Sequence, residues 1–310
     1  MNPLRLYTHS ACLAHRPGAM HAERPERLQA VTGAIDAAFP QLLWEEAPRA
    51  SRSELLRAHG DALLALVLDS EVEADAEPLA LDPDTSLSRG SAEAALRAAG
   101  AGIAAVDAVM AGDARRAFCA VRPPGHHATG TTAMGFCLFN NIAVAAAHAC
   151  DRHGLARVAV VDFDVHHGNG TQAIFEADPR VMYVSSHQLP LYPDSGFADE
   201  RGVGNVLNLP LPPGTGSDAF RAGWRERLLP ALDGFRPQLV FVSAGFDAHR
   251  LDPLAQFELD ADDYRWLTAE LVAIADRHAD GRVVSMLEGG YDITALRESS
   301  VAHVGALLQD

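Results

Sequence analysis

Two aspartates and two histidines directly follow an apolar run in the segment 158–170, which reads VAVVDFDVHHGNG. Side chains of these types are seldom buried without a partner. On an extended backbone alternate side chains point to the same side, so Asp162, Asp164 and His166 face one way. Asp164 and His166 thus form an Asp-x-His pair that can bind a metal ion.

A third ligand must come from elsewhere in the chain, and Asp247 is the natural candidate because it ends another apolar run, VFVSAGFD. One imidazole and two carboxylates leave a coordination position open, as a catalytic metal requires. Zinc and ferrous iron both suit this donor set. For an isolated Asp-x-His pair, a helix-capping aspartate beside a hydrogen-bonded histidine is the simpler interpretation. The further polar segments described below favour the metal site.

Adjacent histidines, His126 and His127, follow the rigid turn RPPG. They could be metal ligands themselves, but proton transfer is the more economical role, with each ring oriented by a polar partner. Asp162 can orient one ring and Asn169 the other. Tyr291 follows EGG, and a phenol there can donate a hydrogen bond to a developing oxyanion. A capping or packing tyrosine is the alternative.

The elements that must position these residues are predicted from short apolar runs separated by helical stretches. Continuous apolar runs are typical of parallel strands that are covered on both faces. The predicted strands are 116–122, 158–164, 180–186, 238–245 and 282–290, and the predicted helices are 91–112, 140–154 and 260–281. Their alternation predicts an α/β fold, a single domain over residues 1–310 with a central, mainly parallel sheet flanked by helices.

A polar segment that contains glycine follows each predicted strand. These segments are RPPGHHATG, DFDVHHGNG, SSHQLPLYPDSG, SAGFDAHRLDP and EGGYDI. In open parallel sheets, ligands bind outside the carboxyl ends of the strands. The five segments should therefore converge on one rim, which predicts an active site at the C-terminal ends of the strands.

Composition limits the possible partners. The chain has 310 residues, 48% of them apolar, and a formal net charge of −16. Such acidity disfavours nucleic acid and anionic lipid, and no apolar run reaches the roughly 20 residues that span a membrane. The four cysteines form no Cys-x-x-Cys pair, and no signal-like apolar segment precedes them. We therefore expect a cytoplasmic protein with reduced thiols. No segment indicates an oligomeric state.

Together these motifs resemble those of the histone deacetylase family, in particular its class II-like bacterial members, within the arginase–deacetylase fold. The resemblance covers nearly the whole chain, through HAERPERL at 21–28, LDPDT, RPPGHHA, GFCLFNN, DFDVHHGNGTQ, LYPDSG, GFDAH and EGGY. It implies a zinc-dependent hydrolase that converts acetylated lysine, or a similar acylated primary amine, to the free amine and acetate. The alternatives are an acetylpolyamine amidohydrolase with the same machinery and a catalytically weak module that binds acyl-lysine.

The resemblance also implies roles for individual residues. The zinc ligands would be Asp164, His166 and Asp247. The tandem histidines His126 and His127 would be supported by Asp162 and Asn169, and Tyr291 would stabilise the transition state. Substrate-binding residues would be Gly135, Phe136 and Tyr192 along a narrow tunnel, Leu254 at its rim, where polyamine-selective members place an acid, and Arg27 near an inner cavity used by acetate.

The family further binds structural potassium ions. By resemblance, a first site would take oxygen atoms from Asp162, Asp164, His166, Ser185 and Ser186. A second would use the backbone near Phe175, Asp178 and Val181. Oxygen-rich cages of this kind suit hard cations.

Three positions refine what the resemblance implies. Asn169 stands where class I members carry an acid, so the partner of His127 is neutral and His127 should be less basic. Position 291 is tyrosine rather than the histidine of a weakly active subgroup, so we expect real turnover. An arginase-like ureohydrolase with two metals is excluded, because it needs a carboxylate four residues after Asp164, where this chain has Gly168.

Overall fold

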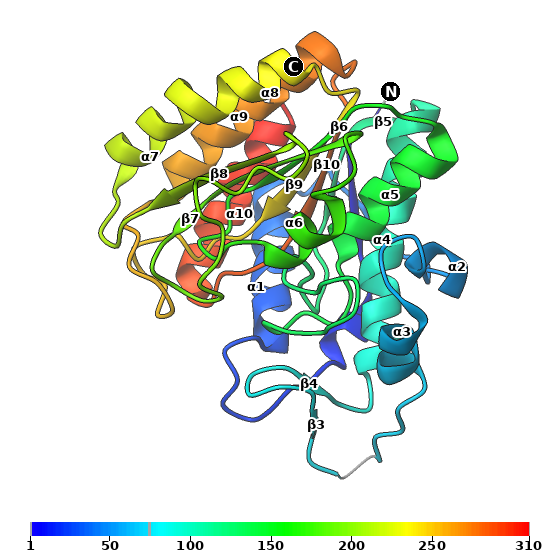
Figure 1. Ribbon diagram of the computed structural model, residues 1–310. Coiled ribbons are helices and arrows are strands. Elements are labelled where there is room, and N and C mark those ends of the chain that lie inside the picture. Colours follow the sequence, from blue (N-terminus) through cyan, green and yellow to red (C-terminus); the bar gives the residue numbers. More distant parts are fainter. Residues whose placement is uncertain (1, 74–75, 310) are drawn as a thin grey trace.

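Eight parallel strands form the central sheet of the computed structural model, which describes residues 2–73 and 76–309 (Figure 1). Their order in the sheet is β2 (Trp44–Glu46), β1 (Asn2–Thr8), β5 (Ala114–Cys119), β10 (Val283–Leu287), β9 (Leu239–Ala244), β6 (Val158–Asp162), β7 (Val181–Gln188) and β8 (Val206–Leu211). Each neighbouring pair is parallel. A short antiparallel pair, β3 (Leu79–Ala80) and β4 (Ser86–Leu87), lies apart from this sheet. The predicted α/β domain with a mainly parallel sheet is confirmed.

The five strands predicted from apolar runs are the five central ones, in the order β5, β10, β9, β6 and β7. Every side chain of β6, β7, β9 and β10 is buried, which explains why these runs are continuous. Several predicted runs extended past the strand ends, so residues 120–122, 163–164 and 288–290 belong to the following loops. The outer strands were not predicted. β8 lies at an edge and contains Pro210, which only an edge strand or a bulge tolerates.

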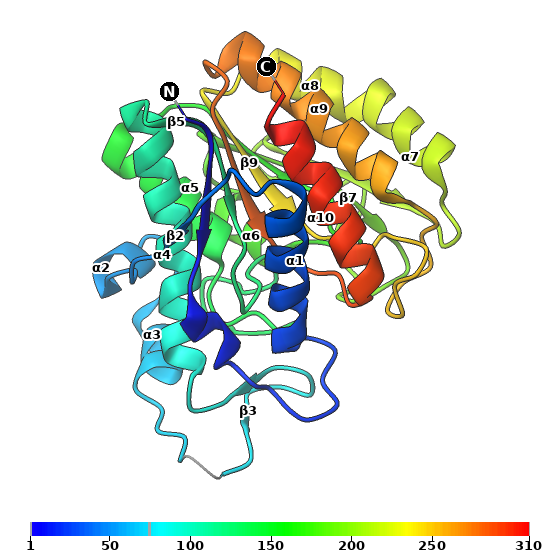
Figure 2. The same cartoon turned by 180° about the vertical axis from the view of Figure 1, so that it is seen from behind.

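Helices cover both faces of the sheet. On one face α4 (Ser91–Ala111) and α5 (Asn141–His153) pack against each other and against the strands, and on the other α1 (Pro25–Ala38), α10 (Ile293–Leu307) and α9 (Ala261–His278) lie side by side (Figure 2). The three predicted helices are confirmed as α4, α5 and α9. α4 and α5 end at Gly112 and Gly154, and α9 begins with a capping box formed by Asp260 and Asp263.

The remaining helices are shorter. They are α2 (Arg52–Leu55), α3 (Asp61–Leu68), α6 (Asn169–Phe175), α7 (Ser217–Gly223) and α8 (Leu229–Phe235), with a 3₁₀ turn at Ser10–Leu13 and a π-helical turn at Trp224–Leu228. Of all the described helices, α4 alone has the length and apolar composition of a membrane span, but 67% of that stretch is buried inside the fold. Its apolarity is explained by packing against α5 and β5.

Candidate active site

Three side chains at the carboxyl ends of β6 and β9 lie close enough to hold one metal ion. Asp164 and His166 follow β6, and Asp247 follows β9, its neighbour in the sheet. His166 Nδ1 lies 3.1 Å from Asp164 Oδ1 and 3.1 Å from Asp247 Oδ2. The structure therefore brings together the three residues predicted as metal ligands.

The donor set and its surroundings fit a divalent cation. Both carboxylates are fully buried, and two buried negative charges so close together need a compensating positive charge. Main-chain N–H groups hold them in place, since Val165 donates to Asp247 Oδ1 at 2.9 Å and Gly289 donates to Asp164 Oδ2 at 2.9 Å. Outer contacts of this kind orient metal ligands. His166 also lines a cavity, so the cluster has an accessible side.

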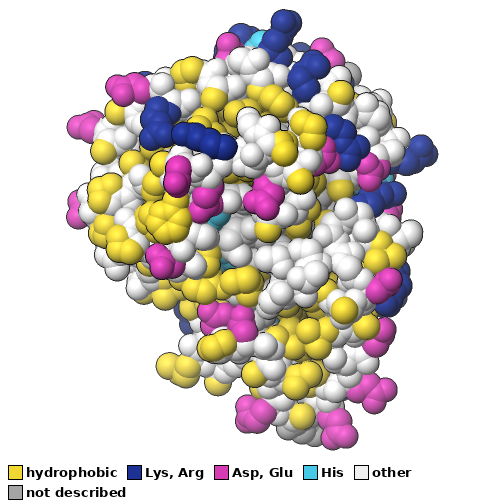
Figure 3. All heavy atoms as spheres, viewed as in Figure 1, with side chains coloured by type: hydrophobic (Ala, Val, Ile, Leu, Met, Phe, Trp, Pro, Cys, Tyr) yellow, Lys and Arg dark blue, Asp and Glu magenta, His cyan; other side chains and the backbone are white. Residues whose placement is uncertain are grey.

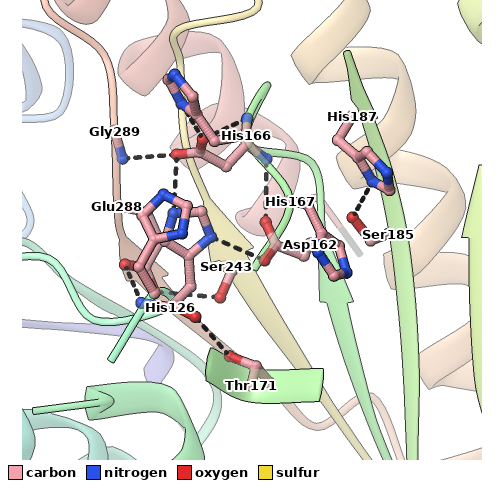
Figure 4. A network of polar contacts seen from close by, with 12 residues as sticks. His126, Asp162, His166, His167, Thr171, Ser185, His187, Ser243, Glu288 and Gly289 are labelled. Carbon is pink, nitrogen blue, oxygen red and sulfur yellow. Dashed lines mark hydrogen bonds and ion pairs between the residues drawn. The ribbon is translucent and has the colours of Figure 1, made fainter. Parts of the chain in front are cut away.

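The tandem histidines have the two partners predicted for them. His126 Nδ1 lies 2.9 Å from Asp162 Oδ2, and His127 Nδ1 lies 2.8 Å from Asn169 Oδ1. Figure 4 shows His126 beside Asp162, with its main chain tied to Glu288 and Thr171. One imidazole therefore faces a carboxylate and the other a neutral amide.

These surroundings separate the pKa values of the two imidazoles. Burial lowers both, but at His126 the charges of Asp162 and Asp164 outweigh burial and raise the pKa to about 10. At His127 burial acts together with the positive charge of His126 and holds the pKa well below the usual 6.5. Titratable pairs whose environments push their pKa values apart mark acid–base sites. At neutral pH these surroundings favour the protonated form of His126 and the neutral form of His127.

Glu288 is a buried carboxylate beneath this pair, which the sequence analysis did not single out. Its Oε2 accepts hydrogen bonds from Gly125 N at 2.6 Å and His126 N at 3.1 Å, and its Oε1 accepts one from Ser243 Oγ at 3.1 Å (Figure 4). Burial raises the pKa of Glu288 to about 7. The side chain ties the turn that carries the tandem histidines to the ends of β9 and β10. In the sequence, Glu288 could have been noticed as the acid that opens the motif EGGY.

A cavity of about 220 Å³ opens onto the metal-ligand cluster. Aromatic rings form much of its wall, since the ring centroids of His127 and Tyr192 lie 5.2 Å apart and those of Phe136 and Tyr291 5.7 Å apart. The lining residues are Asp84, His127, Gly135, Phe136, His166, Leu191, Tyr192, Leu254 and Tyr291. Four of the five predicted substrate-binding residues, all except Arg27, thus line one cavity together with Tyr291. Asp84 and Leu191 also line it, and the sequence analysis did not predict them as site residues.

The backbone of Gly135 lies so close to the imidazole of His127 that a residue with a Cβ atom would not fit there without a shift. Its φ of +57° is left-handed, and a Cβ atom built there would lie 2.5 Å from His127 Cδ2. Phe136 is also left-handed, with φ of +68°, an unusual conformation for a bulky residue. Its N–H donates to Thr85 Oγ1 at 3.0 Å, which helps to hold it. The local backbone therefore presses one cavity wall against the imidazole of His127.

Arg27 lies behind the cavity and is not among the residues that line it. Its Nε donates to Gly290 O at 2.5 Å and its Nη2 to Glu288 O at 2.6 Å. The guanidinium carbon lies 4.8 Å from the ring centroid of Tyr291. In this structure Arg27 thus supports the loop that carries Tyr291, and the inner cavity implied by the resemblance is not needed to explain its place.

A buried ionic chain links this loop to the turn of the tandem histidines. Glu23 accepts from Arg27 Nη1 at 3.0 Å and from Arg122 Nη2 at 2.6 Å, and all three residues are fully buried. Burial would raise the pKa of Glu23, but the charge of Arg122 prevails and lowers it to about 2. Arg122 stands four residues before His126. In the sequence, Glu23 could have been noticed as one of several charged residues close together in HAERPERL.

Asp84 places an acid on the cavity wall. It is half-buried, and burial together with neighbouring Asp82 raises its pKa. Acidic side chains also lie on the lower part of the surface in Figure 3, in the region where Figure 1 shows β3 and β4. Exposed glutamates of that region include Glu71, Glu73 and Glu77. Of these acids, Asp84 is the one that lines the cavity.

The residues expected at the two potassium sites are also grouped. Asp162 and Ser185 are register partners on β6 and β7, with Ser186 next along the strand, so the first set lies around these strand ends. Its Ser185 Oγ and His187 Nδ1 are 2.9 Å apart (Figure 4). The carbonyl groups of the second set, Phe175, Asp178 and Val181, surround the side-chain amide of Asn205.

Comparisons with known proteins agree with this geometry. A family model described as "Histone deacetylase domain" matches residues 21–307. A histone deacetylase-like amidohydrolase of Pseudomonas aeruginosa is 46% identical over 280 residues, which cover 88% of this chain and 73% of that protein. The human polyamine deacetylase HDAC10 is 40% identical over 306 residues, covering 93% of this chain and 45% of that protein. The crystal structure of the HDA15 HD domain matches with a TM-score of 0.93 at 34% identity, covering 99% of this chain and 88% of that one.

Proposed function

The chain belongs to the histone deacetylase family, and we propose that it is a metal-dependent deacetylase that hydrolyses acetylated lysine, or a similar acylated primary amine, to the free amine and acetate. One observation carries this proposal. A cavity walled by aromatic rings ends at the buried cluster of Asp164, His166 and Asp247, with a neutral His127 and the phenol of Tyr291 on its wall. Such a cavity admits a slender aliphatic stem and places its amide at the cluster.

A zinc or ferrous ion held by Asp164, His166 and Asp247 would polarise the acyl carbonyl and lower the pKa of a water molecule toward about 7. His127 accepts the proton of the attacking water, because it is neutral and lines the cavity. Tyr291 donates its phenolic hydrogen to the developing oxyanion. Burial raises the pKa of Tyr291 well above 10, so this hydrogen is retained at neutral pH.

We assign protonation of the departing amine to His127 as well. Of the tandem histidines only His127 lines the cavity, whereas His126 lies behind it against Asp162. His127 then acts first as the base and afterwards as the acid, because its place on the cavity wall brings it into contact with the reacting atoms in both steps. His126 keeps its proton and contributes positive charge close to the site.

We propose acetyl-lysine or a similar neutral-ended substrate as the first candidate, because Leu254 offers no anionic partner at the rim. Acetylated polyamines are the second candidate, and two observations favour them. Asp84 supplies a carboxylate on the same cavity, and a relative is named a polyamine deacetylase. A second cationic nitrogen would need such an acid within hydrogen-bonding reach.

The test compares kcat/KM for acetyl-lysine peptides, free acetyl-lysine and acetylated polyamines. We expect the wild type to favour the lysine substrates, and Leu254→Glu to shift the ratio toward polyamines by roughly tenfold or more, since a hydrogen bond to a charged group contributes about 1.5–3 kcal/mol. Leu254→Gln, which places a side chain of the same length without the charge at this position, is the matched control and should shift it less. A wild-type preference for polyamines would reverse the two candidates. Absence of acetate release from any substrate would favour the acyl-lysine-binding module.

Two further features belong to this proposal. The oxygen atoms around Asp162 and Ser185 suit a structural potassium ion at the first site. The four cysteines are all buried and unpaired, as expected of a protein in a reducing compartment such as the cytoplasm.

A further inference from the structure

Three main-chain carbonyl groups converge on one side-chain nitrogen, at the place where the family resemblance implies a second potassium ion. Asn205 Nδ2 lies 2.7 Å from Phe175 O, 3.0 Å from Asp178 O and 2.7 Å from Val181 O. Phe175 ends α6, Val181 begins β7, and Asn205 immediately precedes β8. One side chain therefore closes the turn between α6 and β7 from the neighbouring strand.

The other end of this amide faces a main-chain N–H group. Val203 N donates to Glu176 O at 2.8 Å and also to Asn205 Oδ1 at 3.1 Å. Together with the three acceptors on the opposite side, this contact favours the orientation in which the nitrogen faces the carbonyl groups. Asn205 is only 6% exposed, which leaves little access for water. The main-chain oxygen of Asn205 accepts from Tyr183 N at 2.9 Å, which anchors the residue to β7.

The three oxygens have the arrangement of a cation cage. A primary amide nitrogen carries two hydrogens, so three acceptors within 3.0 Å exceed what it can satisfy with linear hydrogen bonds. Rings of main-chain carbonyl groups are the means by which proteins replace the hydration shell of potassium. An ion at the centre of these oxygens would have to occupy the position of Nδ2.

We infer that the amide of Asn205 takes the place of the second cation, so that the turn from 175 to 181 is held to β8 without an ion. With the amide nitrogen of Asn205 in this position, the residues present do not fit a potassium ion bound by Phe175, Asp178 and Val181, and the inference replaces that expectation. The inference depends on neither the proposed reaction nor its substrate. It leaves the first potassium site as proposed.

The direct test locates a thallium ion, which substitutes for potassium and scatters anomalously, in crystals of the wild type and of Asn205→Ala. We expect no anomalous peak among the three carbonyl groups in the wild type and a peak there in the variant. A peak at this turn in the wild type would overturn the inference. Its absence from both proteins would overturn it equally, because the oxygens would then not form a cation cage.

A second test compares melting temperatures in potassium chloride and in choline chloride at equal ionic strength. Asn205→Ala removes the side-chain donor from three buried carbonyl groups, although Phe175 O and Asp178 O still accept from Asp178 N at 2.9 Å and Val181 N at 3.1 Å. We expect it to lower the Tm in choline chloride by roughly 2 °C or more. Potassium should recover part of this loss, beyond any response of the wild type. Asn208→Ala is the matched control, since Asn208 is a buried asparagine on β8 that donates to Gln172 Oε1 at 2.8 Å.

The first potassium site is unaltered in Asn205→Ala, so its response cancels against the wild type. Asn208 is the register partner of Ser185, so Asn208→Ala controls for the loss of a buried amide and not for the potassium response. An equal potassium response of Asn205→Ala and the wild type would contradict the inference. If Asn205→Ala does not fold in either salt, the wild-type crystals keep the inference falsifiable, because a thallium peak at this turn would still overturn it. Both readouts are independent of deacetylase activity.

Discussion

Replacing Asn169 by aspartate changes the charge beside the proposed base with almost no change of shape. His127 Nδ1 and Asn169 Oδ1 are 2.8 Å apart, so the new carboxylate would face the imidazole directly. Two unit charges about 4 Å apart interact by about 4 kcal/mol at an effective dielectric constant of about 20. One pKa unit corresponds to about 1.4 kcal/mol, so about three units is an upper bound. We expect the pKa of His127 to rise by roughly 1–2 units.

The sign of the effect on activity follows from the role of His127. The base works as a neutral imidazole, so activity is lost as the pH falls through its pKa, and a raised pKa moves the acidic limb of the kcat/KM profile upward by the same amount. The assay is a pH–rate profile on an acetyl-lysine peptide. Asn169→Ala, which removes the partner without adding charge, should show no upward shift. An acidic limb at the same pH in wild type and Asn169→Asp would refute the assignment of His127 as the base.

Three further substitutions test the supports of the site. Tyr291→Phe should lower kcat by about a hundredfold or more while leaving metal content unchanged, because one oxyanion donor is lost; near-normal turnover would remove Tyr291 from the mechanism. In Gly135→Ala the new Cβ would lie 2.5 Å from His127 Cδ2, so the ring must move by about 1 Å and kcat should fall about a hundredfold; wild-type kcat would show that the ring adapts. Glu23→Gln removes the charge between two buried arginines and should cost about 3 kcal/mol in chemical denaturation. In the wild type the pKa of Glu23 is lowered to about 2, so the stability that its charge contributes is fully present above the ordinary carboxyl pKa near 4.5 and is lost as the pH falls toward 2. A variant as stable as the wild type at neutral pH would contradict this role of Glu23.

The parts of the fold that the sequence predicted are those that burial constrains most. Strands β6, β7, β9 and β10 are buried on both faces, and in β5 every residue except Arg115 is buried, so their apolar residues stand in short runs. The outer strands carry weaker patterns, since β8 is partly exposed and interrupted by Pro210. The metal-ligand cluster was predictable because aspartate and histidine are rare at the ends of buried strands.

The supports of the site depend on contacts that no local pattern encodes. Glu23 and Arg122 are 99 residues apart in the chain, and Glu288 bonds Gly125 across 163. Arg27 was assigned to the substrate by motif, whereas its place behind Tyr291 depends on how the first helix packs. Asn205 shows no sign in sequence of facing Phe175, Asp178 and Val181, because that contact arises only when β8 pairs with β7.

The most direct test of the central claim is a metal titration of the chelator-stripped protein, with acetate released from an acetylated amine measured at each addition of zinc. We predict that acetate release is lost in the stripped protein and returns linearly up to one zinc ion per chain. Asp247→Asn, which weakens one ligand of the cluster, should not regain it at one equivalent. Undiminished acetate release from the fully metal-free wild type would contradict the account, because Asp164, His166 and Asp247 would then have no role as metal ligands in the reaction.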